Sequence, residues 1–286
     1  MRLPRLRALL FDMDGVLYRG QTPLPGAAAL LAFLDRAGLP YALVTNNSTR
    51  TPRQYARLLA QMRMRVPPAR IVTSSVSTAA YLRQRLPAGA RVLVVGEAAL
   101  RRALVDAGFV PAWEHVAAVV VGLDRHVSYR KLALATRALL DGARFVLTNP
   151  DLLLPTESGV IPGAGSLAAA LHAATGRRPT VIGKPHPRLL REALARLGAR
   201  PARAAIVGDQ VATDVAAGRA AGLYTILVRT GVTAPASPPG RALRPDLVVR
   251  DLRELHRRLV ATGVRRRSPG GAARGSRHRV RNGPRR

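Results

Sequence analysis

Short apolar runs alternate with longer segments of helical periodicity along most of the chain. In five of these runs β-branched residues are common, and polar residues or glycine follow each run. Such continuous apolar runs are typical of parallel strands that are covered on both faces. The strands predicted in this way are Ala8 to Phe11, Tyr41 to Val44, Thr180 to Ile182, Ala204 to Val207 and Thr225 to Val228.

Predicted helices lie between these strands. One segment has leucines at helical spacing and runs from Pro25-Gly26 to Gly38, with a turn signal at each end. Two more helices, Pro187 to Leu197 and Asp214 to Ala221, precede the fourth and fifth strands. This strand–helix–strand order predicts an α/β fold with a doubly wound, Rossmann-like parallel sheet and right-handed crossovers.

The middle of the chain, from about Ile71 to Arg178, repeats the alternation on its own. A stretch of this length can bury its own core, which predicts an inserted α/β domain. We therefore expect a core domain from residues 1–72 and 179–263, interrupted by a cap domain at residues 73–178. The elements predicted in the insertion are the strands Arg91 to Val95, Ala117 to Val121 and Phe145 to Leu147, and the helices Ser77 to Arg85, Glu97 to Ala107 and Tyr129 to Leu140.

The chain of 286 residues is strongly basic, with a formal net charge of +30. Nine arginines and no acidic residue lie between Arg265 and Arg286, but most of the excess charge is spread over the rest of the chain. Residues 264–286 are predicted to form a basic disordered tail, because they hold almost no large apolar side chain. Binding of nucleic acid through this tail is an alternative function, although the tail has no aromatic residue for base stacking.

The composition also excludes several classes of protein. The absence of cysteine excludes disulfide scaffolds, thiolate zinc sites and cysteine nucleophiles. No apolar run approaches the roughly 18 residues of a membrane span, so we expect no membrane partner. The apolar stretch after the basic N-terminus stops at Asp12, which is too early for a signal peptide. A cytoplasmic protein is expected.

Two carboxylates, Asp12 and Asp14, follow the first predicted strand, at the edge where open α/β sheets bind ligands. One aspartate can attack phosphorus to form an aspartyl-phosphate, while a second holds the proton that the leaving oxygen needs. Two adjacent carboxylates also repel each other, and Mg²⁺ relieves this repulsion because it takes oxygen ligands. The alternative is a capped turn, since Asp14-Gly15 is a common turn pair.

Three further polar clusters follow predicted strands. Thr45 and Asn46 offer a hydroxyl, an amide and backbone N–H groups to phosphate oxygens, or they cap the helix that follows. Lys184, one of only two lysines, would place a fixed positive charge beside a phosphoryl group. Asp209 adds a third carboxylate for the cation. Asp214 would bind the metal through water or orient Lys184, or it is a first-turn helix aspartate favoured by the helix dipole.

These motifs resemble, in their chain order, those of the haloacid dehalogenase (HAD) superfamily of phosphohydrolases. The resemblance covers most of the chain and implies a HAD core with an inserted cap. It implies that Asp12 is the nucleophile and that Asp14 is the general acid and base. It further implies that Mg²⁺ is held by Asp12, the backbone carbonyl of Asp14, and Asp209, and that phosphate is held by Thr45, Asn46 and Lys184.

The position of the insertion, after the second motif and before the third, resembles subclass IIA, the NagD-like or 4-nitrophenylphosphatase-like group. That group's cap commonly forms dimer contacts, so a homodimer through the cap is expected. The sequence departs from the group's pattern at His186 and Gln210, which puts the carry-over of a substrate in doubt. The stretches that resemble the group are Thr148-Asn149-Pro150-Asp151, Pro155-Thr156-Glu157, Pro162-Gly163-Ala164-Gly165 and Thr230-Gly231-Val232-Thr233.

The sequence thus predicts a Mg²⁺-dependent phosphatase for small phosphorylated metabolites. Sugar phosphates, glycerol phosphate, phosphoglycolate and nucleotides all fit a capped site of this kind. A phosphotransferase on the same scaffold is the nearer alternative, and the nucleic-acid-binding protein is the more distant one.

Overall fold

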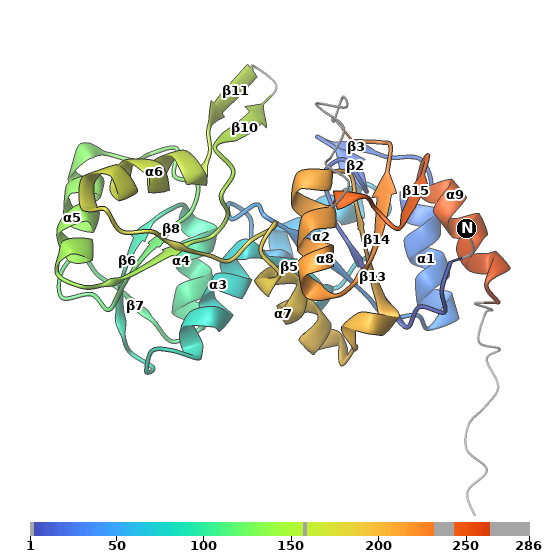
Figure 1. Ribbon diagram of the computed structural model, residues 1–286, viewed down its shortest axis with the longest axis horizontal. Coiled ribbons are helices and arrows are strands. Elements are labelled where there is room, and N and C mark those ends of the chain that lie inside the picture. Colours follow the sequence, from blue (N-terminus) through green and yellow to red (C-terminus); the bar gives the residue numbers. More distant parts are fainter. Residues whose placement is uncertain (1–2, 157–158, 232–242, 264–286) are drawn as a thin grey trace, which may run out of the picture.

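The computed structural model describes residues 3–156, 159–231 and 243–263, and it forms two lobes that lie side by side (Figure 1). We call the lobe around the six-stranded sheet the core lobe and the lobe around the five-stranded sheet the cap lobe. The predicted tail, residues 264–286, lies outside the described residues, as do Glu157, Val232 and Thr233 of the predicted motifs.

The core lobe is built on a parallel sheet with the strand order β15-β14-β13-β1-β4-β5. Strand β1 lies near its centre, where Leu9 pairs with Ala205 on one side and with Tyr41 on the other. The strands are β1 (Ala8–Phe11), β4 (Tyr41–Thr45), β5 (Ile71–Thr73), β13 (Ala204–Gly208), β14 (Tyr224–Val228) and β15 (Leu247–Val249).

Helices cover both faces of this sheet. Leu9 and Phe11 pack with α1, α2 and α9 on one face, and Ala8 and Leu10 pack with α7 and α8 on the other. All four side chains are fully buried, as the continuous apolar run predicts. The predicted doubly wound α/β architecture is confirmed. The helices are α1 (Ala27–Ala37), α2 (Pro52–Gln61), α7 (Arg188–Leu197), α8 (Ala216–Ala221) and α9 (Leu252–Ala261).

The cap lobe has its own parallel sheet, with the strand order β12-β9-β8-β6-β7. Helices α3 and α4 pack on one face of this sheet, and α5 and α6 pack on the other. Its elements are β6 (Arg91–Val95), β7 (Val110–Pro111), β8 (Ala118–Val121), β9 (Arg144–Leu147), β12 (Thr180–Val181), α3 (Ser74–Arg83), α4 (Ala98–Asp106), α5 (Tyr129–Leu140) and α6 (Ala164–Thr175).

One predicted strand lies in a different sheet from the one expected. Thr180–Val181 is a strand, but it pairs with β9 at the edge of the cap-lobe sheet instead of joining the core strands. A run of two or three apolar residues indicates an extended backbone. It does not indicate which strand it will pair with, because that depends on the path of the whole chain. The predicted domain ranges 1–72, 73–178 and 179–263 stay a prediction.

Two short hairpins project on the same side of the molecule, one from each lobe (Figure 1). They are formed by β2 (Tyr18–Arg19) with β3 (Thr22–Pro23), and by β10 (Leu153–Thr156) with β11 (Gly159–Pro162). The remaining elements are the 3₁₀ helices η1 (Pro68–Arg70) and η2 (Pro201–Arg203) and a π-helix, η3 (Val211–Val215). Among the residues described, none of the helices has the length and apolarity needed to cross a bilayer.

Candidate active site

The carboxyl edge of the core sheet carries the first predicted aspartate. Asp12 directly follows β1, and its backbone N–H donates to the carbonyl of Val207 at 2.9 Å, which extends the pairing of β1 with β13. The Nζ atom of Lys184 lies 2.8 Å from Oδ1 of Asp12 and 2.7 Å from Oδ1 of Asp214. One buried ammonium therefore bridges carboxylates that follow two different strands.

Three carboxylates converge at this point, because oxygen atoms of Asp12, Asp209 and Asp214 lie within 4.8 Å of one another. Asp209 comes directly after β13, and Asp214 lies in η3. The second oxygen of Asp214 accepts the backbone N–H of Gln210 at 3.1 Å, so both oxygens of Asp214 have partners within the protein. Hard oxygen donors grouped in this way suit Mg²⁺ or Ca²⁺. The residues present thus fit a divalent cation.

The three carboxylates that converge here are buried, where ionisation is unfavourable. Burial raises the pKa of Asp12 to about 7; Lys184 opposes this shift, and the charges of Asp214 and Asp209 add to it. Burial and the neighbouring Asp214 raise the pKa of Asp209 to about 6. Burial alone would lower the pKa of Lys184, but its two carboxylate partners prevail and hold that pKa above its usual range. A proton or a cation is therefore favoured among these carboxylates.

Asp14 lies two residues beyond Asp12, and its side chain faces the cavity between the lobes. Partial burial raises the pKa of Asp14 above its ordinary value, although the residue remains exposed. The turn after it closes by a hydrogen bond from the Gly15 N–H to the Tyr18 carbonyl at 2.8 Å. Gly15 has a φ of 78°, and an added Cβ there would lie 2.4 Å from Oδ2 of Asp209. The turn thus requires glycine, and it brings the chain against Asp209.

Asn46 has a role that its sequence position did not indicate. Its Oδ1 accepts the backbone N–H of Lys184 at 2.8 Å, and its Nδ2 donates to the Lys184 carbonyl at 2.9 Å. The side-chain amide is therefore engaged with the backbone of Lys184. The alternative that Thr45 or Asn46 caps the next helix is wrong, because Thr51 caps α2 by accepting the N–H of Gln54.

A cavity of about 640 Å³ lies between the two lobes. Six of the predicted site residues line it, namely Asp12, Asp14, Thr45, Asn46, Lys184 and Asp209. Asp214 lies behind Lys184 and is 1% exposed. Of the two departures from the family pattern, Gln210 lines the cavity and His186 does not.

Both lobes supply cavity residues that carry no motif signal. The core lobe adds Tyr18, Arg19 and Tyr55, and the cap lobe adds Leu123 and Leu153. These aromatic and aliphatic side chains and Arg19 follow the same pattern as ordinary core or surface residues, so the sequence does not single them out. Asn149 and Asp151, from a stretch that the resemblance did mark, also line the cavity.

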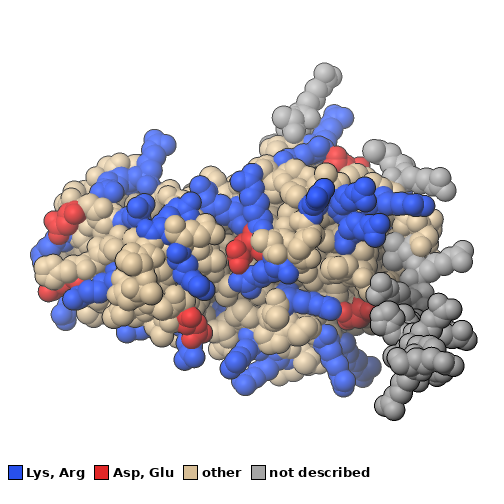
Figure 2. All heavy atoms as spheres, turned by 90° about the horizontal axis from the view of Figure 1, so that it is seen from below, with Lys and Arg blue, Asp and Glu red and all other residues tan. Residues whose placement is uncertain are grey.

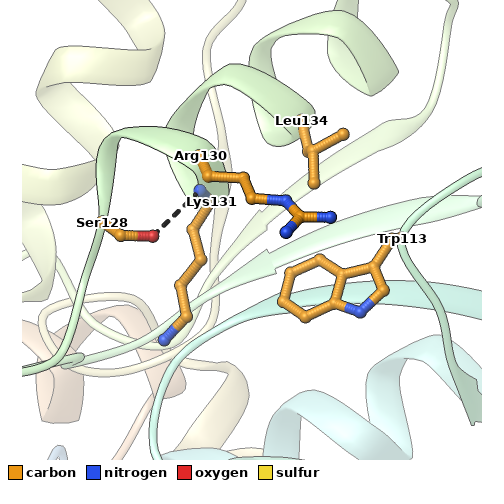
Figure 3. Close-up of a pocket in the computed structure, with 5 residues that line it drawn as sticks. All are labelled: Trp113, Ser128, Arg130, Lys131 and Leu134. Carbon is orange, nitrogen blue, oxygen red and sulfur yellow. Dashed lines mark hydrogen bonds between the residues drawn. The ribbon is translucent and has the colours of Figure 1, made fainter.

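A second, smaller hollow of about 200 Å³ lies in the cap lobe at the start of α5 (Figure 3). In Figure 3 the side chain of Trp113 faces those of Arg130 and Leu134 across it. Ser128, which also lines it, caps α5 by accepting the backbone N–H of Lys131. None of the residues that line this hollow is a predicted site residue, so the predicted chemistry belongs to the larger cavity.

Comparison with known proteins agrees with this geometry. Residues 9–110 match a family described as haloacid dehalogenase-like hydrolase, and residues 181–255 match a HAD-hydrolase-like family. The chain is 39% identical over 253 residues to the acid sugar phosphatase of Staphylococcus aureus, an alignment that covers 88% of this chain and 97% of that protein.

Solved structures give the same result. The p-nitrophenyl phosphatase from Archaeoglobus fulgidus is 35% identical, with a TM-score of 0.84, and the match covers 89% of this chain and 99% of that one. A glycerol phosphate phosphatase from Mycobacterium tuberculosis, solved in complex with magnesium, is 38% identical, with a TM-score of 0.81 over 88% of this chain and 77% of that one. The chain therefore belongs to the haloacid dehalogenase-like hydrolases, as a phosphatase of the 4-nitrophenylphosphatase-like group that its motifs predict.

Proposed function

We propose that this phosphatase is Mg²⁺-dependent and hydrolyses small phosphomonoesters through an aspartyl-phosphate on Asp12. The observation that carries the proposal is the convergence of Asp12, Lys184 and Asp209 at one end of the cavity between the lobes. This arrangement offers a nucleophile, a fixed positive charge and an oxygen-rich cation site within reach of one phosphoryl group.

In the first step a carboxylate oxygen of Asp12 attacks phosphorus, and the bond from phosphorus to the leaving oxygen breaks. Asp14 donates its proton to that oxygen, so the leaving group departs as a neutral alcohol. The raised pKa of Asp14 supports this role, because it keeps the proton available closer to neutral pH. Asp14 then takes a proton from water, whose oxygen attacks phosphorus and breaks the bond to Asp12. Free phosphate and unmodified Asp12 result.

We assign the cation to Asp12, Asp209 and the backbone carbonyl of Asp14. Both oxygens of Asp214 have partners within the protein, so its role is to hold Lys184. When bound, Mg²⁺ would neutralise negative charge on the carboxylates and on the phosphoryl group. We assign the phosphoryl oxygens to the Lys184 ammonium and to Thr45, with Asn46 contributing from its backbone.

For the substrate class we propose small phosphorylated metabolites with a polar leaving group. The cavity of about 640 Å³ has room for a molecule of sugar-phosphate size, and its lining mixes amide, carboxylate and apolar groups. The relatives are named for sugar phosphate, glycerol phosphate and p-nitrophenyl phosphate, which indicates that such leaving groups suit this scaffold. The cytoplasmic location, the homodimer through the cap and binding of nucleic acid by the tail stay predictions.

The test is hydrolysis of 4-nitrophenyl phosphate with Mg²⁺ and with EDTA, and by Asp12→Asn. We expect Asp12→Asn to lower kcat by at least about a thousand-fold, because it removes the nucleophile and leaves the buried volume unchanged. Its melting temperature should stay near that of the wild type. Asp106→Asn, at an exposed aspartate of α4, serves as the matched control and should keep full activity. Retained turnover in a clean preparation of Asp12→Asn would remove the mechanism.

A further inference from the structure

Three segments that are distant in sequence meet behind the proposed phosphate site. They are Asn46 after β4, residues 148–151 after β9, and Gly183 and Lys184 after β12. An added Cβ on Gly183 would lie 2.5 Å from Oδ1 of Asn46 and 2.7 Å from the carbonyl oxygen of Thr148. The backbone at Gly183 thus has no room for a side chain, and both lobes contact it directly.

One side-chain amide fixes both polar backbone groups of Lys184. Asn46 accepts the Lys184 N–H at 2.8 Å through Oδ1 and donates to the Lys184 carbonyl at 2.9 Å through Nδ2. This pattern determines which way the amide faces, because the oxygen must meet the N–H group and the nitrogen must meet the carbonyl. The starting point of the lysine side chain is therefore set by the Asn46 amide.

The Asn46 amide is held in turn by the cap lobe. Oδ2 of Asp151 accepts from Nδ2 of Asn46 at 3.2 Å and from Nδ2 of Asn149 at 2.7 Å. Oδ1 of Asn149 accepts the hydroxyl proton of Thr148 at 2.8 Å. A continuous chain of hydrogen bonds therefore runs from the end of β9 to Lys184, and Asn149 within it is 8% exposed.

We propose that Asn46 and Asp151 are positioning residues for the Lys184 ammonium, with Asp151 orienting the Asn46 amide that fixes the Lys184 backbone. Asp151 lines the cavity, and its Oδ2 accepts hydrogen bonds from the amides of Asn46 and Asn149, which link it to Lys184. Through these contacts the placement of the cap-lobe segment sets the geometry of the charge beside Asp12. This proposal rests on the proposed function and names residues that support its catalytic lysine.

The first experiment compares Asp151→Leu with Asp151→Asn in steady-state kinetics. Leucine removes both acceptor oxygens at similar volume, whereas asparagine keeps one oxygen that can accept from Asn46. We expect Asp151→Leu to lower kcat about ten-fold with little change in KM, since a catalytic group misplaced by about 1 Å can cost up to about 100-fold. Asp151→Asn should restore most of the loss. If the carboxylate charge instead bound substrate, both variants would raise KM to a similar extent.

Two further measurements make the kinetic test specific. The loss of kcat should be the same for 4-nitrophenyl phosphate and for glycerol phosphate, because Lys184 contacts the group that both share. The double variant Asn46→Ala with Asp151→Leu should be no slower than Asn46→Ala alone, since Asp151 acts only through Asn46. Losses that depend on the leaving group, or that multiply in the double variant, would overturn the proposal.

Amide hydrogen exchange tests the same link without any turnover. The Lys184 N–H should exchange about ten-fold faster or more in Asp151→Leu, because the amide that accepts its hydrogen bond is no longer oriented. Asp124→Asn is the matched control, because this buried cap-lobe aspartate pairs with Lys131 and accepts the backbone N–H of His126. Unchanged exchange in Asp151→Leu would overturn the positioning role. If the wild type hydrolyses no phosphomonoester, the proposed function fails, while the exchange result still decides this inference.

Discussion

At the scale of single residues, the positive charge of Lys184 offsets the negative charges of two buried carboxylates. It is 2% exposed, and its ammonium contacts carboxylates of Asp12 and Asp214 at 2.8 and 2.7 Å. The sequence placed Asp12 and Asp209 after strands that do lie in the core sheet, whereas the strand before Lys184 pairs in the cap-lobe sheet. The contact of the Asn46 side chain with Lys184 joins residues 138 positions apart, so no local pattern could have shown it.

Removal of the lysine charge should destabilise the fold in a pH-dependent way. Lys184→Met leaves two buried carboxylates without their partner, which costs about 3–5 kcal/mol at pH 8. The loss should be smaller at pH 5, because Asp12, whose pKa is already about 7 beside the lysine, then carries a proton. Urea unfolding at both pH values measures the effect. Arg102→Met, at the exposed ion pair with Asp106, is the control and should cost only about 1 kcal/mol or less. Equal losses at the two pH values would contradict this account.

The raised carboxyl pKa values also predict how Mg²⁺ stabilises the protein. Asp12 and Asp209 titrate near 7 and 6 in the folded protein and near 3.8 when unfolded, so the folded state binds more protons between those limits. Without metal, the free energy of unfolding should therefore fall as pH rises from about 4 to about 7. Mg²⁺ competes with protons for these oxygens, so it should raise the melting temperature more at pH 8 than at pH 5.

Thermal scans with Mg²⁺ or EDTA at the two pH values test this prediction. Asp209→Asn is the comparison, because it removes a proposed metal ligand and should lose most of the Mg²⁺-induced shift. A shift of the same size at pH 5 and pH 8, or one that persists in Asp209→Asn, would count against the metal assignment.

At the scale of elements, periodicity predicted the central strands of both sheets and several of their helices, but it did not predict the edge strands β5, β7 and β15 or the helices α6 and α9. Gly38 ends α1 in the left-handed conformation, and Tyr129–Leu140 forms α5, as expected. The strand Thr180–Val181 joined the cap-lobe sheet, and the hairpins β2–β3 and β10–β11 were not predicted. Two-residue strands show no alternation, and their pairing is set by contacts with segments that are distant in sequence.

The end of β13 packs closely against η3 at Gly208. An added Cβ on Gly208 would lie 2.2 Å from Cβ of Asp214, so Gly208→Ala must push η3 away from Lys184. We expect a loss of about 1–3 kcal/mol in unfolding free energy. We also expect a fall in kcat, because Asp214 no longer holds the lysine. Denaturant unfolding and steady-state kinetics measure the two effects.

Gly89→Ala is the matched control for this glycine. An added Cβ there meets nothing within 4 Å, although its φ of 77° makes alanine cost about 1 kcal/mol. It should lose some stability and keep kcat. Wild-type kcat in Gly208→Ala would show that η3 can move without disturbing Lys184.

On the scale of the whole molecule, Asp12 and Asp209 follow strands of the core-lobe sheet, Lys184 follows a strand of the cap-lobe sheet, and residues of both lobes line the cavity. The surface is basic on both lobes: the face shown in Figure 2 carries many Lys and Arg side chains and few Asp and Glu. The formal net charge of +30 gives the chain a positive field, which attracts a phosphate dianion over distances up to the Debye length.

If this positive field attracts the substrate, the rate at which enzyme and substrate associate should depend on salt concentration. Between about 0.02 and 0.2 M NaCl we expect kcat/KM for 4-nitrophenyl phosphate to fall about three-fold or more, with kcat little changed. Salt screens the approach of the substrate, whereas the bound phosphoryl group lies among buried charges that are screened less. Sucrose solutions provide a control for changes in viscosity and water activity. A kcat/KM that is flat across this range would show that the surface charge does not steer the substrate.

The sequence by itself determined the α/β class, the order of the motifs and the placement of Asp12, Asp14, Thr45 and Asp209 at or just after the ends of strands of the core sheet. It could do so because a buried strand needs a continuous apolar run, and parallel strands present their carboxyl ends at one edge. Only the tertiary structure decided that Asn46 and Asp151 hold Lys184, that Thr180–Val181 pairs in the cap lobe, and which apolar side chains wall the cavity. Those features depend on contacts between segments far apart along the chain, and local periodicity carries no information about which distant segments will meet.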